Sequence, residues 1–263
     1  MNPTNEKTIQ ATNAEGGLPD LQISGAQATV TFRRAAQANR LGPDDLEALA
    51  AHIQTVNQNS AVLVIVIRGE GKYFCSGYDI GQIGLNRVVD FESVVNALED
   101  ARPVTIARIQ GGVYGGGTDL SLACDFRIGT PATEMFMPAA RLGLHFYPRG
   151  MERYVSRLGL DQAKRLFLTA ERINAHEMKA IGFLTELVEA DMLDVRTQAL
   201  ANTLCSMAPL AITGMKKHLN HIATGKLNLG DLKTDMSRAG ASEDLKEGRQ
   251  AWLEKRAPSF KGY

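Results

Sequence analysis

Two long apolar runs constrain the fold of this chain more than any other feature of its sequence. Residues 61–71 read AVLVIVIRGEG, and residues 103–112 read PVTIARIQGG. Continuous runs rich in valine and isoleucine are typical of strands that are buried on both faces of a sheet. Each run ends in glycines and is followed by a helical pattern. The sequence therefore predicts an α/β fold, in which crossover helices join parallel strands.

The segments outside these runs predict how the chain is divided. Residues 21–34 alternate around a glycine and indicate a hairpin. From about residue 196 the strand pattern disappears, and amphipathic helices are predicted over residues 196–207, 208–224 and 242–257. We expect three regions. They are a frayed tail (residues 1–20), an α/β core that holds the site (residues 21–195) and a helical oligomerisation region (residues 196–263).

Composition excludes several classes of partner. The 29 Lys and Arg residues balance 29 Asp and Glu residues, so the net charge is zero and neither nucleic acid nor an anionic membrane surface is an expected partner. No apolar run approaches the length of a membrane span, and the first twenty residues lack the apolar core of a signal peptide. Cys75, Cys124 and Cys205 fit neither a disulfide framework nor a zinc site. We expect a cytoplasmic protein without a bound metal.

Three consecutive glycines precede a predicted helix in the stretch VYGGGTDL, residues 113–120. Helix N-termini offer N–H groups without helical partners, and glycine lets an oxygen atom approach the backbone closely. The stretch is therefore a candidate oxyanion hole, in which fixed donors stabilise a developing negative charge. Tight packing of a turn is the alternative. The pattern does not match the common phosphate-binding glycine loops.

Four motifs together resemble the crotonase, or enoyl-CoA hydratase/isomerase, family. They occur in order, from about residue 20 to the C-terminus, and are FCSGYDI (74–80), IQGGVYGGGTDLSLACDFRI (109–128), FMPAARLGL (136–144) and EGRQAWLEKRAPSF (247–260). The resemblance implies a spiral of ββα units with a C-terminal helical region, assembled as trimers or hexamers. It also implies an acyl-CoA substrate, with coenzyme A present as part of the substrate thioester and no tightly bound cofactor.

The resemblance also implies a set of binding residues. Two backbone N–H groups of the family hold the thioester oxygen as it becomes an enolate, and the matching positions here are Tyr78 and Gly116. The positions that match contacts to coenzyme A are Ser76, Tyr78 and Ile80 along the adenine, Arg33 and Arg34 near the phosphates, and Phe260 and Lys261 at the C-terminus. A solvated strand end is an equal alternative for the two arginines, and Phe260 and Lys261 can belong to a neighbouring subunit's site.

Hydratases of the family use two carboxylates, of which this chain retains one. The first position matches Asp119 and the second matches Ala139, which can carry no proton. Aspartate is one CH₂ shorter than glutamate, so its carboxylate sits roughly 1.5 Å further back. A displacement of that size can cost around 10²-fold in rate. We expect Asp119 to be an ionised general base, or else a structural carboxylate in the first turn of a helix.

The loop LGLHFYPRG contains two groups that could replace the missing carboxylate. His145 could titrate near neutrality and Tyr147 could donate a hydrogen bond, although lining of the pocket is an alternative for both. Arg149 and Arg153 are expected to be structural or solvent-facing, or else to pair with a substrate carboxylate. The predicted function is an enoyl-CoA hydratase or isomerase that forms a thioester enolate. A decarboxylase, a hydrolase or a catalytically weak acyl-CoA-binding subunit are the alternatives.

Overall fold

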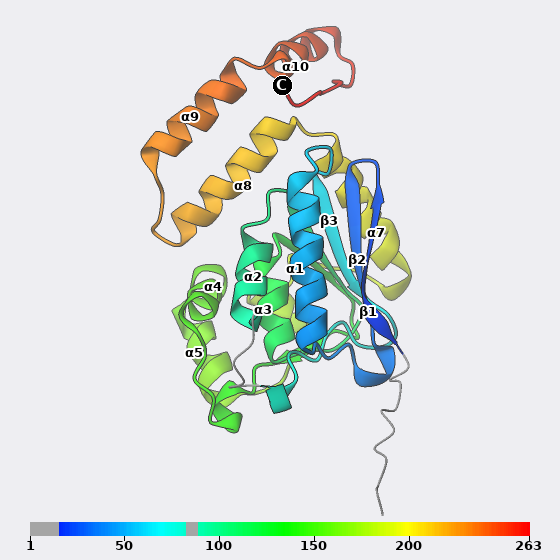
Figure 1. Ribbon diagram of the computed structural model, residues 1–263, viewed down its shortest axis with the longest axis vertical. Coiled ribbons are helices and arrows are strands. Elements are labelled where there is room, and N and C mark those ends of the chain that lie inside the picture. Colours follow the sequence, from blue (N-terminus) through cyan, green and yellow to red (C-terminus); the bar gives the residue numbers. More distant parts are fainter. Residues whose placement is uncertain (1–15, 83–88) are drawn as a thin grey trace, which may run out of the picture.

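A six-stranded sheet forms the centre of the computed structural model, which describes residues 16–82 and 89–263 (Figure 1). The strand order is β1-β2-β3-β4-β6-β9. Only β1 and β2 pair antiparallel, as the predicted hairpin, and all other neighbours in this sheet are parallel. The strands are β1 (Gly17–Ser24), β2 (Gln27–Arg33), β3 (Val64–Gly69), β4 (Val104–Ile109), β6 (Phe126–Gly129) and β9 (Glu186–Leu187). The predicted parallel α/β sheet is thus confirmed.

Helices cover both faces of the sheet, as continuous apolar strands require. They are α1 (Pro43–Gln58), α2 (Phe91–Glu99) and α3 (Gly116–Ala123) on one face and α7 (Leu193–Cys205) on the other (Figure 1). Alternate residues of β3 point to opposite faces. Ile65 and Ile67 pack in the core beneath α1, α2 and α3, whereas Val64 and Val66 pack with α7. The prediction that this strand is buried on both faces is confirmed.

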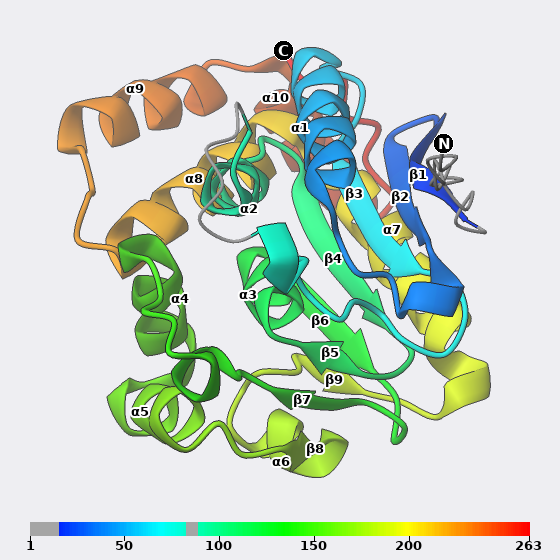
Figure 2. The same ribbon diagram turned by 60° about the horizontal axis from the view of Figure 1, so that its bottom comes forward.

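A small second sheet with the order β5-β7-β8 lies beside the start of α3 (Figure 2). Its strands are β5 (Val113–Tyr114), β7 (Glu134–Phe136) and β8 (Ile173–Asn174), and the helices around it are α4 (Pro148–Leu158), α5 (Leu160–Thr169) and α6 (Ala175–Ala180). Short 3₁₀ turns occur at Ala35–Gln37, Ile80–Gln82, Ala139–Leu142 and Ala190–Met192. This arrangement brings the chain that follows β7 next to the three glycines.

The last three helices form an arm that extends from the core (Figure 1). They are α8 (Pro209–Ala223), α9 (Leu229–Gly240) and α10 (Glu243–Glu254). The sequence indicated the first and the last of these but not α9, whose start is capped by the side chain of Asn228. The expected boundary at residue 196 falls within α7, which packs on the sheet. The first strand begins at Gly17, ahead of the expected start of the core, and residues 1–15 lie outside the described residues.

Candidate active site

A cavity of about 420 Å³ opens where the loop after β3 meets the starts of α2 and α3. Its walls come from the segments 76–82, 90–92, 115–116 and 137–147, and from Arg40. A larger cavity of about 720 Å³ lies between α8 and α10 and contains none of the predicted catalytic residues. The smaller cavity is therefore the candidate active site, because it contains the glycine loop and residues of the motifs FCSGYDI and FMPAARLGL.

Each of the three glycines at the start of α3 is required for a different structural reason. Gly115 has a φ of +50° and a ψ of −125°, a combination that only glycine adopts without strain. A Cβ at Gly116 would stand 2.6 Å from the ring of Phe91, and a Cβ at Gly117 would stand 2.5 Å from the carbonyl oxygen of Cys75. Both distances are too short for real atoms. The glycines therefore allow α2 and the loop after β3 to approach the start of the helix closely.

The loop that contains Gly77 and Tyr78 lies directly against this helix start. The Tyr114 amide donates a hydrogen bond of 2.9 Å to the Cys75 carbonyl, which joins the loop to β5. A Cβ at Gly77 would stand 2.8 Å from the Gly116 nitrogen. Tyr78, the next residue, and Gly116 both line the cavity. Gly116 is the first residue of α3, so its N–H has no carbonyl partner inside the helix and is available to a ligand.

The structure places Asp119 behind the cavity wall. Its side chain is fully buried on α3 and does not line the cavity. Arg153 on α4 holds both carboxylate oxygens, since Nε donates to Oδ1 over 3.0 Å and Nη2 donates to Oδ2 over 2.8 Å. The Tyr147 hydroxyl also donates to Oδ2. Asp119 is thus one member of a hydrogen-bonded ion pair.

Arg153 extends this network to the end of α2. Its Nη1 donates to Glu99 Oε2 over 2.9 Å and to Asn96 Oδ1 over 3.0 Å, and only 1% of the residue is exposed. Burial alone would lower the pKa of Arg153, but the hydrogen bonds and charge of Asp119 and the charge of Glu99 raise it overall. Arg149 also pairs with Glu99, over 2.8 Å. Both arginines therefore have protein partners, in line with the expected structural role.

Tyr147 is the member of the network that lines the cavity. Its ring stacks on Phe146, with centroids 4.4 Å apart, and meets the edge of Phe91. Burial, and after it the negative charge of Asp119, raises the pKa of Tyr147. His145 also lines the cavity but is exposed, and its Nδ1 lies 2.8 Å from the Phe146 carbonyl oxygen.

Ala139, which the sequence comparison matched to the second carboxylate position, lines the cavity. Three acidic residues that the sequence reasoning did not single out also line it. Asp79 lies 3.8 Å from Arg40, and Asp90 caps α2 by accepting from the Ser93 amide. Glu92 is half-buried and makes no hydrogen bond or ion pair with the residues that the structure describes. The sequence held one signal for Glu92: it is an acidic residue in the first turn of a helix that follows a glycine-containing loop.

The predicted contacts to coenzyme A fall into three groups. Ser76, Tyr78 and Ile80 line the cavity. Arg33 is exposed at the end of β2 and Arg34 pairs with Asp45 over 3.2 Å, so neither lines the cavity, whereas Arg40 does. The third group is Phe260 and Lys261, which follow α10 at the far end of the molecule from α4 and α5 (Figure 1).

None of the helices in residues 16–82 and 89–263 is long and apolar enough to cross a membrane. Within the same ranges, no group of three or more His, Cys, Asp and Glu side chains is arranged to hold a metal ion.

The chain is similar to many proteins that act on coenzyme A thioesters. A family profile described as enoyl-CoA hydratase/isomerase matches residues 22–263. The Bacillus subtilis protein YngF, whose name assigns it provisionally to the enoyl-CoA hydratases/isomerases, is 32% identical over 89% of this chain and 94% of its own length. A short-chain-enoyl-CoA hydratase of Clostridium acetobutylicum is 28% identical over 90% of this chain and 94% of its own.

Solved structures with a similar fold belong to the same group of proteins. The crystal structure of an enoyl-CoA hydratase from Bacillus anthracis superposes with a TM-score of 0.85, at 28% identity, over 94% of this chain and 100% of that chain. The expected crotonase-like fold is therefore confirmed, and so is the expectation of an enzyme. By sequence and by structure, the chain belongs to the enoyl-CoA hydratase/isomerase family.

Proposed function

We propose that this protein hydrates a short α,β-unsaturated acyl-CoA, with the thioester oxygen bound by the backbone N–H groups of Tyr78 and Gly116. The close approach of the chain at Gly77 to the Gly116 nitrogen, which a Cβ at Gly77 would meet at 2.8 Å, carries this proposal, because the next residue, Tyr78, and Gly116 both line one cavity. Donors that are fixed before negative charge develops give the largest single contribution in many enzymes. The relative from Clostridium, named a short-chain-enoyl-CoA hydratase, supports the choice of substrate.

The cavity suits this chemistry in size and lining. Its volume of about 420 Å³ lies within the usual range for small-molecule sites. Apolar walls from Met137, Leu144 and Phe146 fit an acyl chain, and Ser76, Ile80 and Arg40 line the cavity on the side of the loop after β3. Arg40 is half exposed, with Asp79 as its partner, and offers a cation to the phosphates of coenzyme A. We assign that role to Arg40 in preference to Arg33 and Arg34, which lie outside the cavity lining.

Hydration of crotonyl-CoA tests the proposal. The purified protein is expected to remove the absorbance of the conjugated enoyl thioester and to form 3-hydroxybutyryl-CoA, which mass spectrometry identifies. Malonyl-type and β-keto acyl-CoA thioesters serve as the comparison, since a decarboxylase or hydrolase would release carbon dioxide or free thiol from them. Faster turnover of these compounds than of crotonyl-CoA would contradict hydration. Tight binding of acyl-CoA without turnover of any of them would contradict an enzyme.

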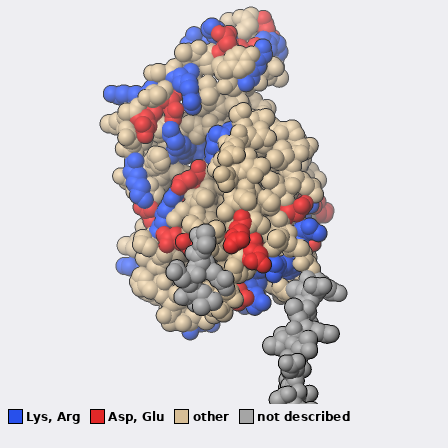
Figure 3. Space-filling view, in the orientation of Figure 1, with Lys and Arg blue, Asp and Glu red and all other residues tan. Residues whose placement is uncertain are grey.

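We further infer that the chain associates with copies of itself through the C-terminal arm. None of the residues of α9 is buried within the single chain, and α9 contacts α8 through an ion pair of Asp235 with Lys217 and a hydrogen bond between Asp235 and His218. Figure 3 shows charged side chains along α8 and α9 on this face. Large apolar side chains elsewhere on the arm are exposed, namely Met215, Leu219, Ile222, Leu229, Met236, Trp252 and Leu253. Exposed apolar surface of this extent is typical of an interface.

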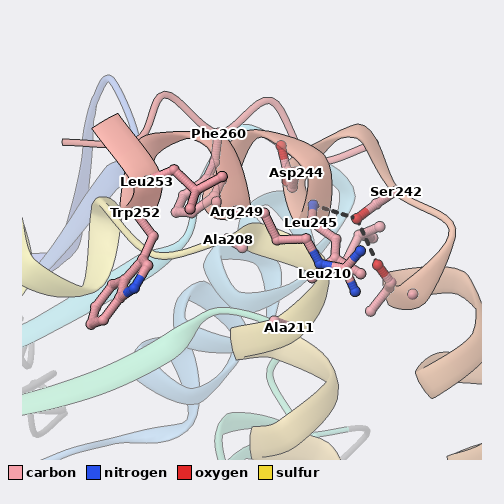
Figure 4. A pocket seen from close by; sticks show the side chains of 13 residues that line it. Ala208, Leu210, Ala211, Ser242, Asp244, Leu245, Arg249, Trp252, Leu253 and Phe260 are labelled. Carbon is pink, nitrogen blue, oxygen red and sulfur yellow. Dashed lines mark hydrogen bonds between the residues drawn. The ribbon is translucent and has the colours of Figure 1, made fainter. Parts of the chain in front are cut away.

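The larger cavity supports the same inference. Phe260 lines it together with Leu210, Leu245 and Leu253 (Figure 4), and a Cβ at Gly248 would stand 3.5 Å from the Phe260 ring. The Lys261 amide donates to Asp244, which fixes the tail at this end of the molecule. Because the acyl cavity lies at the other end, Phe260 and Lys261 can serve coenzyme A only in a neighbouring subunit.

Replacing Trp252 by glutamate is expected to dissociate the assembly. Trp252 is 85% exposed in the single chain, and a buried carboxylate at an interface would have no partner. Light scattering after gel filtration should show an oligomer for the wild type and a lower mass for Trp252→Glu at the same concentration. Gln250→Lys also adds one charge to exposed α10 surface and is the matched control, with the wild-type mass expected. A monomeric wild type would contradict the inference.

A further inference from the structure

The buried ion pair leaves Asp119 without direct access to a substrate. Arg153 binds both carboxylate oxygens, the side chain is 0% exposed, and the cavity lining does not include it. A general base has to come within hydrogen-bond distance of the proton that it takes. In this structure a carboxylate at position 119 can reach the cavity only through a neighbour, and the neighbour that both lines the cavity and bonds to it is Tyr147.

We propose that Tyr147 is the proton-transferring catalytic residue, and that Asp119 acts on the substrate only through the Tyr147 hydroxyl. The inference rests on the proposed hydration and adds to it which group handles the proton. The Tyr147 hydroxyl donates its hydrogen to Asp119 Oδ2, so the lone pairs of the phenol oxygen remain to accept a hydrogen bond from a water molecule in the cavity. The Tyr147 oxygen thus takes over the proton transfer that a carboxylate at position 139 would otherwise share, because Ala139 has no group that can carry a proton.

The relay balances over one turnover. As water attacks the β-carbon, the new C–O bond forms and the electrons of the double bond move to the thioester oxygen. The water proton passes to the Tyr147 oxygen while the phenol proton passes to Asp119. The α-carbon then takes the proton from Tyr147, the enolate electrons form the new C–H bond, and Asp119 returns its proton to Tyr147. Water is added across the double bond, and both side chains return to their starting states.

The surroundings keep the phenol protonated at rest. Burial and the charge of Asp119 raise the pKa of Tyr147, so below about pH 10, the ordinary value for tyrosine, the hydroxyl holds its proton. The charged or titratable groups around it are Asp119 on α3, Arg153 on α4 and His145 in its own loop. The positive charge of Arg153 acts in the opposite direction, but it is outweighed.

Arg153 and Glu99 are positioning residues in this scheme. Arg153 donates in a fork to Asp119, which fixes the plane of the carboxylate, and Glu99 holds the other side of the guanidinium over 2.9 Å. The ring of Tyr147 is held independently, by Phe146 and Phe91. The hydroxyl is therefore positioned both by aromatic packing and by a buried charge.

A double-mutant cycle on crotonyl-CoA hydration tests the proposal. Tyr147→Phe is expected to lower kcat by at least about 10²-fold, the usual contribution of a general acid or base. Asp119→Asn should lower kcat by a similar factor, and the double variant should be no slower than the slower single variant. Independent roles would instead multiply to roughly 10⁴-fold. Tyr154→Phe is the matched control, since its buried hydroxyl bonds to Thr118 outside the cavity, and it should keep kcat within about threefold of the wild type, against the 10²-fold loss expected of a general acid or base.

Tyr147→Phe decides the proposal even where Asp119→Asn does not fold, because it leaves the ion pair of Asp119 and Arg153 in place. A Tyr147→Phe enzyme within about threefold of the wild-type kcat would overturn the proposal, since a general acid or base contributes far more. Glu92→Gln is measured beside it, because Glu92 is a cavity carboxylate without a partner among the described residues. Loss of activity in Glu92→Gln together with an active Tyr147→Phe would assign the proton to Glu92.

An ultraviolet titration of tyrosinate separates this proposal from the proposed reaction. Asp119→Asn removes the negative charge beside Tyr147, so one tyrosine should ionise at lower pH than in the wild type, and this change should vanish when Tyr147→Phe is added. A wild type that fails to hydrate crotonyl-CoA would overturn the proposed function while this titration still reports the contact. A titration unaffected by Asp119→Asn would overturn the inference alone.

Discussion

Removing the N–H group of Gly116 is expected to lower kcat for enoyl-CoA hydration by roughly 10²–10³-fold, the usual cost of one oxyanion donor. Proline at this position lacks the N–H but suits the first turn of a helix, where its fixed φ is compatible and no helical hydrogen bond is lost. Proline also places a CH₂ group where the hydrogen stood, so the thioester oxygen cannot approach. The effect should appear in kcat more than in KM, because the charge develops only in the transition state.

The comparison needs a background in which the new side chain has room. Any Cβ at position 116 would stand 2.6 Å from the Phe91 ring. We therefore compare Gly116→Pro with Gly116→Ala, both in a Phe91→Ala background. The two variants add similar bulk and lose the same ring, and only the proline variant lacks the N–H. Equal hydration rates in this pair would show that the Gly116 amide does not hold the developing charge.

Local sequence patterns predicted the part of the fold that is built from continuous apolar strands. The strands β3 and β4 are rich in Val and Ile, and this composition is typical of strands that are buried on both faces of a sheet. The helix α9 was missed although Leu229, Leu232 and Met236 recur on one face at helical spacing, and none of its residues is buried in the single chain. Its Asn228 cap was the remaining signal.

The motifs predicted which residues surround the cavity better than they predicted what those residues contact. Tyr78, Gly116, His145 and Tyr147 all line it. The pairing of Asp119 with Arg153 joins α3 to α4, and no local pattern specifies such a contact between helices. A signal was nevertheless present. Arg153 lies on the side of α4 that buries Gly150, Tyr154 and Leu158, and a charge on the apolar face of a helix requires a buried partner.

The buried side chain of Arg153 should also be costly to remove. Arg153→Met is expected to lower the free energy of unfolding by about 3–5 kcal/mol, the usual cost of breaking a buried ion pair from one side. Glu99 would keep Arg149 at 2.8 Å and Arg157 at 3.7 Å, so most of the loss should arise at Asp119, which would keep only the Tyr147 hydroxyl. Methionine resembles the arginine stem in length, which limits the contribution of lost packing.

Urea unfolding at one fixed protein concentration measures this loss, because self-association would otherwise change the apparent stability. Arg238→Met is the matched control. Arg238 pairs with Asp235 over 3.5 Å but its side chain is 60% exposed, and exposed pairs contribute at most about 1 kcal/mol. Adding Asp119→Asn to Arg153→Met should restore part of the loss, since it removes the carboxylate that has lost its partner. If the double variant is instead less stable than Arg153→Met alone, the cost does not come from an unpaired charge at Asp119, and the buried ion pair does not hold this part of the site together.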